Sequence, residues 1–200
     1  MNIYVNFWLY SHWIFHVGDR SSRSIMITDC YHLTYQATLQ FMGLLKGIDP
    51  LLTADVLHVL RSMGHGDRLC ICDCNFPAAQ VATQTTSGKH IILTVSLPEA
   101  IKAICSVLPL DYFEETQAMY MSPQDGVVMP PAGIEVVSGL KEAIVEHCGS
   151  DTNIDPIERF SFYEEAKKCF AVIQTMERRP YGNVILIKGC VGPDGNDLKP

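Results

Sequence analysis

A histidine between two glycines is the group in this sequence best suited to transfer a proton. Gly64-His65-Gly66 stands between a segment with helical spacing and a short apolar segment. The unperturbed pKa of histidine, roughly 6.5, lies close to neutral pH, and the flanking glycines leave the imidazole uncrowded. A carboxylate, Asp73, follows at the far end of the apolar segment, so the pair could supply acid and base. The alternative is a solvated loop histidine that caps the preceding helix, with Asp73 as a turn residue.

A second group of polar side chains lies near the C-terminus. Tyr181-Gly182-Asn183 follows Pro180 and precedes an apolar segment. A phenol and a carboxamide each donate and accept hydrogen bonds, which suits the recognition of hydroxyl groups, and Gly182 permits a close approach to the backbone. The alternatives are core packing for Tyr181 and a turn role for Asn183.

The element that leads to His65 has clear helix signals. Thr53 is suited to the N-cap, and Gly64 is placed to end the helix. Apolar residues between them recur at i, i+3, i+4 and i+7, which is one helical face. These residues are Val56, Val59, Leu60 and Met63.

The rest of the pattern alternates between strands and helices. We expect strands at 69–72, 91–95, 118–121, 157–160, 171–175 and 184–188, and further helices at 98–108, 136–148 and 162–169. The polar, threonine-rich residues 78–89 are expected to form a loop. This alternation predicts the α/β class, as a layered domain.

Composition excludes some classes of function. The chain has 200 residues with 48% hydrophobic content, which suits one globular domain. A net charge of −7 argues against a nucleic-acid partner. The apolar stretch 7–17 is shorter than the ~20 residues that a membrane helix needs, so no membrane association is expected.

The eight cysteines are spaced irregularly and indicate free thiols in a reducing compartment, here the cytoplasm. Cys70, Cys72 and Cys74 alternate, so a strand would point all three to one face. Thiols in such a line do not readily enclose a tetrahedral metal ion, so we expect packing rather than a metal site.

Several separated motifs together resemble one family. They are Leu-Leu-Lys-Gly-Ile-Asp-Pro-Leu-Leu at 44–52, Met-Gly-His-Gly-Asp at 63–67, Asp-Cys-Asn-Phe-Pro-Ala at 73–78, Ile-Glu-Arg-Phe-Ser-Phe-Tyr-Glu at 157–164 and Tyr-Gly-Asn at 181–183. In this order the chain resembles the L-fucose mutarotases and D-ribose pyranases over roughly residues 42–191, and it looks closest to the animal members. One departure is that residues 91–96 replace the Arg-Ala-Asp-Gly stretch that the family usually carries.

The resemblance implies a layered α/β/α domain with a central mixed sheet and a reaction that interconverts sugar anomers. It implies no cofactor and no metal. The implied catalytic residues are His65, as proton donor, with Tyr163 and Tyr181, and the implied sugar-binding residues are Asp73, Asp111, Arg159, Tyr181 and Asn183. For Tyr163 the alternative is core packing, and for Arg159 it is a surface ion pair. Asp67 is expected to be structural.

The resemblance also divides the chain. Because it begins near Met42, residues 1–41 are expected to be an extension without a packed fold, and residues 42–200 the domain that carries the site.

The spacing of His65 and Asp73 raises a geometric problem. A straight strand of about six residues at ~3.3 Å each would separate the two groups by roughly 20 Å, which a monosaccharide cannot bridge. Either the His65 loop folds back over the sheet edge, or the pocket joins groups from two subunits. The ring-shaped homo-oligomers of the family, with pockets between neighbours, favour the second option.

The resemblance therefore implies the activity of an L-fucose mutarotase, with L-fucose or a related monosaccharide as partner. Within the same chemistry the alternative is a D-ribose pyranase. From another class, the alternative is a sugar-binding protein that has kept the fold without catalysis.

Overall fold

The structure is a computed structural model that describes residues 43–200, and residues 44–200 form one compact unit. The extension expected at residues 1–41 lies outside the described residues.

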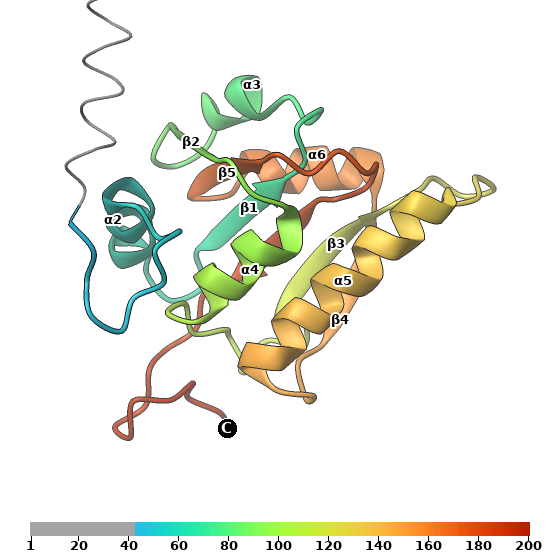
Figure 1. The fold of residues 1–200 in the computed structure, drawn as a ribbon. Helices are drawn as coiled ribbons and strands as arrows, with labels where there is room; N and C mark the ends of the chain where they lie inside the picture. Colours follow the sequence, from blue (N-terminus) through green and yellow to red (C-terminus); the bar gives the residue numbers. More distant parts are fainter. Residues whose placement is uncertain (1–42) are drawn as a thin grey trace, which may run out of the picture. The chain divides into compact units, whose positions relative to one another are not determined.

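A six-stranded mixed sheet forms the centre of the unit (Figure 1). Its strands, in spatial order, are β2 (Lys89–Leu93), β5 (Ala171–Thr175), β1 (Arg68–Cys72), β6 (Val184–Ile187), β3 (Ala118–Ser122) and β4 (Ile154–Glu158). β6 is antiparallel to both of its neighbours, and the other adjacent pairs are parallel. The predicted α/β class with a mixed sheet is confirmed.

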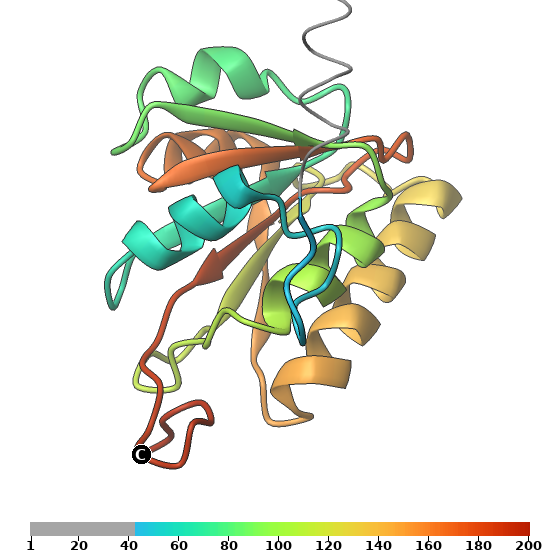
Figure 2. The same cartoon turned by 60° about the vertical axis from the view of Figure 1, so that its left-hand side comes forward.

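Helices cover both faces of the sheet (Figures 1 and 2). The helices are α2 (Ala54–Ser62), α3 (Ala78–Ala82), α4 (Leu97–Cys105), α5 (Pro131–Cys148) and α6 (Arg159–Lys167). One apolar core joins α2, α4 and α5 to the sheet, and a second joins α3 and α6 to its opposite face. The central strands β5, β1 and β6 are therefore buried on both sides, as expected for a covered sheet. No helix within residues 43–200 is both long and apolar enough to span a bilayer.

Capping residues explain where several helices begin. The Thr53 hydroxyl accepts a hydrogen bond from the Val56 N–H at the start of α2, as predicted. Ser96 and Glu99 form a capping box at the start of α4. Glu158 caps α6 by accepting hydrogen bonds from the Phe160 and Ser161 N–H groups.

The prediction of a loop at residues 78–89 is wrong, because a helix forms at its beginning and a strand begins at its last residue. Residues Ala78–Ala82 form α3, because Ala78, Val81 and Ala82 pack into the second core despite the polar sequence around them. Strand β2 then begins at Lys89 rather than residue 91. Packing into the second core decides the first boundary, and pairing of Lys89 with Ala171 of β5 decides the second.

Boundaries elsewhere also shift. The strand expected at 157–160 runs instead over β4 and ends at Glu158, where the helix cap described above ends the extended backbone. Pro156 is tolerated because β4 is an edge strand. The helix expected from residue 136 begins at Pro131, a favoured first helical residue.

Candidate active site

His65 lies in the loop between α2 and β1, and its ring contacts a buried carboxylate. Its Nε2 is 2.8 Å from Asp111 Oδ2, and the two side chains are 51% and 3% exposed. A carboxylate oxygen accepts hydrogen bonds, so His65 Nε2 is the donor in this contact and Asp111 fixes the orientation of the imidazole. The other Asp111 oxygen accepts the Phe113 N–H at 3.1 Å, and the Phe113 ring lies edge-on to the imidazole.

The loop that carries His65 is held from both sides. The Asp67 carboxylate accepts the Gly64 N–H at 2.7 Å, so Asp67 is structural as expected. The Lys188 backbone accepts the Gly66 N–H and donates to the Asp67 carbonyl, at 2.8 and 2.9 Å. The Lys188 ammonium also donates to the Leu60 and Met63 carbonyls near the end of α2. No local pattern indicates this role of Lys188, which depends on β6 lying beside β1.

Asp73 follows the end of β1 and forms a buried pair with Asn183, the residue that precedes β6. Asn183 Nδ2 donates to Asp73 Oδ2 at 2.8 Å, and the Asp73 N–H donates to Asn183 Oδ1 at 3.0 Å. Both residues are almost fully buried. Burial raises the pKa of the Asp73 carboxyl, and the hydrogen bond from Asn183 opposes that effect. Two residues about 110 positions apart in sequence therefore fix each other's side chains.

The Asp73 loop is also supported from β5. The Gln174 amide nitrogen lies 3.4, 3.2 and 3.4 Å from the carbonyl oxygens of Asp73, Cys74 and Phe76. Its amide oxygen contacts His90 Nε2 at 3.0 Å. Since the amide nitrogen donates to these carbonyls, His90 must be the donor in that contact.

Tyr181 has a strained backbone. Within residues 43–200 it is the one residue other than glycine with a positive φ, 66°. Such a conformation costs on the order of 1–3 kcal/mol and persists only where surrounding contacts impose it. The Tyr181 ring packs on α5, where a Cβ at Gly133 would lie 3.3 Å from the ring. A strained residue next to the Asp73–Asn183 pair is consistent with a functional constraint.

Tyr163 and Arg159 both come from α6. The Tyr163 ring is half-buried and stacks on Phe76 of the Asp73 loop, with centroids 5.4 Å apart. The ring of Tyr163 can therefore pack in the core while its phenol is available to the site, so the two alternatives given for this residue are compatible. Arg159 follows β4, is half-buried, and forms no ion pair with any residue of the 43–200 unit.

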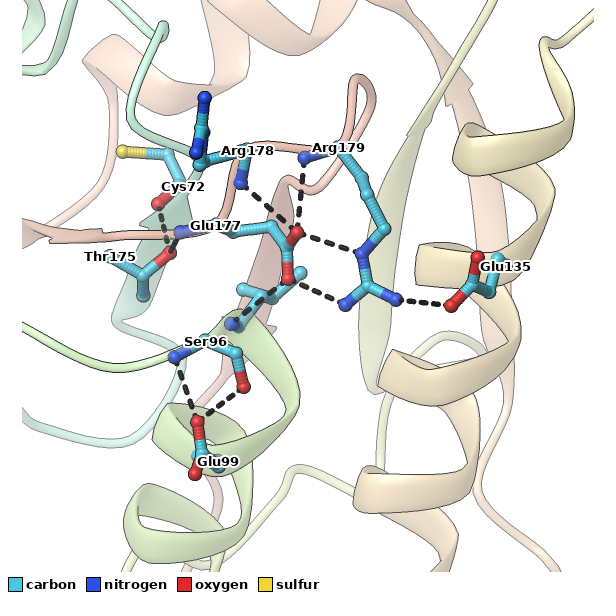
Figure 3. A network of polar contacts seen from close by, with 9 residues as sticks. Cys72, Ser96, Glu99, Glu135, Thr175, Glu177, Arg178 and Arg179 are labelled. Carbon is cyan, nitrogen blue, oxygen red and sulfur yellow. Dashed lines mark hydrogen bonds and ion pairs between the residues drawn. The ribbon is translucent and has the colours of Figure 1, made fainter.

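Glu177 and Arg179 form an ion pair in the segment between β5 and β6 (Figure 3). The Glu177 side chain is buried, and that of Arg179 is 30% exposed. Arg179 Nη2 lies 2.7 Å from Glu177 Oε2, and Arg179 Nε lies 2.8 Å from Oε1. Hydrogen bonds from Arg179 lower the pKa of Glu177 to about 2. Neither residue was predicted to matter. The sequence signal for this ion pair is an acid and an arginine two residues apart, just after a buried strand.

This pair predicts a specific acid dependence of stability. The pKa of Glu177 lies below its usual 4.5, so the stabilisation is complete above pH 4.5 and is lost as the pH falls toward 2. After allowance for solvent screening, we expect roughly 1–3 kcal/mol. Urea unfolding of the wild type and Glu177→Gln between pH 7 and 2 should give free energies of unfolding that converge at the acidic end. Parallel curves would contradict this expectation.

The predicted site residues fall into two groups at opposite ends of the strands. We refer to these ends as the His65 edge and the Asp73 edge of the sheet. His65 and Asp111 lie where β1 and β3 begin. Asp73, Asn183 and Tyr181 lie where β1 ends and β6 begins, and β4 and α6 bring Arg159 and Tyr163 to that same edge. The five residues of β1 alone separate the groups by about 13 Å. The loop fold-back considered above is wrong, because His65 is held to Asp111 at its own edge.

The three alternating cysteines do not share a strand. β1 ends at Cys72, so Cys74 lies in the following turn, while Cys70 and Cys72 pack in the second core. The prediction that one strand points all three thiols to the same face is wrong, because Cys74 lies outside the strand. Residues 43–200 contain no cluster of three or more acidic, histidine or cysteine side chains that could hold a metal ion.

The fold and these side chains define an α/β protein that carries a histidine–carboxylate pair at one end of β1 and a buried aspartate–asparagine pair at the other. The sequence model of the RbsD / FucU transport protein family matches residues 46–191, and the chain belongs to this family. The family predicted from the motifs is thereby confirmed.

Known proteins with this fold include named mutarotases. A fucose mutarotase of Danio rerio is 41% identical over 162 residues, which cover 76% of this chain and 98% of that protein. The crystal structure of protein Atu2016 has a TM-score of 0.69 and 45% identity, covering 76% of this chain and 99% of that one. The fucose mutarotase of Streptococcus pneumoniae, solved in complex with L-fucose, has a TM-score of 0.65 and 31% identity, covering 74% and 100%.

Proposed function

We propose that this protein is an L-fucose mutarotase. The observation that carries the proposal is the pairing of an exposed histidine with a buried carboxylate in a chain similar to named fucose mutarotases. The reaction needs one group to deprotonate the anomeric hydroxyl and another to protonate the ring oxygen. The bond between the anomeric carbon and the ring oxygen then breaks, its electron pair stays on the oxygen, and the free aldehyde rotates before the steps reverse.

The site residues have the chemistry for these steps. His65 is the proposed proton donor, and Asp111 fixes its ring and contributes to the sugar pocket. Tyr163 and Tyr181 are the proposed partners in proton transfer. Asp73, Arg159, Tyr181 and Asn183 are the proposed sugar ligands. Ring opening by positioned acid and base groups is worth typically ~10²–10⁴-fold, which suffices for a reaction that already proceeds in water.

The two edges of the sheet must meet for this chemistry, and we propose that they meet between subunits. A contact that joins one edge of a copy to the opposite edge of the next is head-to-tail, and such contacts form a ring when the rotation between copies closes. Each pocket would then combine His65 and Asp111 of one copy with Asp73, Asn183 and Tyr181 of its neighbour. A shallow cavity of about 440 Å³ beside the His65 loop, lined by Gly66, Asp67, Arg68, Glu165 and Lys168, leaves that edge open to a neighbour.

Two further proposals concern the chain as a whole. The cysteines of residues 43–200 are free thiols, which supports a cytoplasmic location. The family match over residues 46–191 supports the proposal that residues 42–200 form the catalytic domain.

Saturation-transfer NMR between the α and β anomeric protons of L-fucose tests the activity directly. We expect the full-length protein to accelerate the exchange, and to act less on D-ribose. Preference for D-ribose would favour the pyranase alternative. Binding of L-fucose without acceleration would favour the non-catalytic sugar-binding alternative, and neither binding nor acceleration would refute the proposed substrate.

A further inference from the structure

The strained turn at Tyr181 needs a cause, and the Glu177 carboxylate supplies one. Its Oε1 accepts the backbone N–H groups of Arg178 and Arg179, at 3.1 and 3.0 Å, so the chain after β5 wraps around this oxygen (Figure 3). Gly182 closes the turn against the same side chain, because a Cβ there would lie 2.8 Å from Glu177 Cγ. The turn is therefore built on Glu177 and has no room for any other residue at Gly182.

Glu177 also joins this turn to the other elements at the same edge. Its Oε2 accepts the Leu97 N–H at the start of α4, at 3.4 Å, besides the bond from Arg179 Nη2. Its backbone carbonyl accepts the Cys74 N–H of the Asp73 loop at 2.9 Å. One residue thus contacts the Asp73 loop and, through the turn that it holds, sets the position of Asn183.

Arg179 keeps this carboxylate charged inside the protein. Glu177 is 4% exposed, and a buried carboxylate without a paired cation is strongly disfavoured. Arg179 binds both of its oxygens and extends to Glu135 on α5 at 3.0 Å. A neutral residue of the same size would weaken the bonds to the Arg178 and Arg179 N–H groups, because charge-assisted hydrogen bonds are about twice as strong as neutral ones.

We propose that Glu177 is a positioning residue that holds Tyr181 and Asn183 in the geometry that receives the sugar. This inference rests on the proposed function, and it adds a residue that does not itself touch the ligand. The charge of Glu177 holds the N–H groups of the turn, and its side chain also packs against Gly182. His65 and Asp111 lie at the opposite edge and are unaffected by it.

The first test is independent of any sugar. In Glu177→Gln we expect the amide hydrogens of Asp73 and Asn183 to exchange at least about tenfold faster relative to Ile173 of β5. These two N–H groups bond to Asn183 Oδ1 and to the Tyr181 carbonyl, so they report directly on the turn. Unchanged exchange at both amides would overturn the proposal.

The second test uses L-fucose. We expect the KM for anomer exchange to rise about tenfold in Glu177→Gln, and the maximal rate to fall less, because the His65 edge is intact. Faster amide exchange with an unchanged KM would overturn the link to the sugar site. If the wild-type protein neither binds fucose nor accelerates exchange, the proposed function fails, while the amide result still decides what holds the turn.

Two control variants separate positioning from general stability. Lys102→Gln removes an ion pair between α4 and α5, and Ile144→Val opens a small cavity in the core; both should leave KM and the two amides unchanged. The same losses in either control would overturn the proposal. Arg179→Lys keeps the charge without the two-point contact and should give an intermediate effect, which also serves if Glu177→Gln does not fold.

Discussion

Replacing His65 with alanine is expected to lower the catalysed exchange of fucose anomers by about 10²–10⁴-fold, which is the usual contribution of a positioned acid or base. The imidazole is half exposed and belongs to neither apolar core, so its removal should leave the fold intact. Saturation-transfer NMR measures the exchange rate, and thermal unfolding followed by circular dichroism checks the fold.

A matched control comes from the same segment. His58 is exposed on α2, seven residues before His65, and His58→Ala should retain the wild-type rate. A folded His65→Ala protein that exchanges fucose anomers at the wild-type rate would remove His65 from the mechanism. Asp111→Asn should lose rate as well, because an asparagine amide does not hold the imidazole as the carboxylate does.

The second prediction with a large effect is that activity recovers when two inactive variants are produced together. His65→Ala and Asp73→Asn are each expected to be nearly inactive, but their lesions lie at opposite edges of the sheet. If each pocket combines the two edges from neighbouring copies, co-producing both variants in one cell restores some pockets. Random mixing leaves about one quarter of the pockets with both edges intact, so we expect about a quarter of the wild-type activity.

The decisive comparison is a mixture in which both lesions share one edge. Co-produced His65→Ala and Asp111→Asn can form no intact pocket, so this mixture should stay as inactive as its components. If the mixture of His65→Ala and Asp73→Asn also shows no recovery, although it forms mixed oligomers by mass spectrometry, the pocket between subunits is ruled out.

Much of the scaffold could be predicted because its signals are local. Thr53, the apolar face of α2 and the apolar strand before Asp73 follow rules that act over a few residues, and the structure confirms these elements. Residues 78–89 were misassigned because their structure depends on distant partners. α3 packs against α6, and β2 pairs with β5, about 80 residues away.

The residue types of the candidate site and the family of the chain follow from the sequence alone. Motifs such as Met-Gly-His-Gly-Asp and Tyr-Gly-Asn are contiguous, so they can be identified without any knowledge of the fold. The tertiary structure decided which of these groups meet. Strand pairing places Asn183 against Asp73 and His65 against Asp111, while β1 holds the two pairs apart. Only the folded chain makes Glu177 a buried anchor. Its partners come from the loop after β1, the start of α4 and the turn before β6, and they gather only when the sheet has formed.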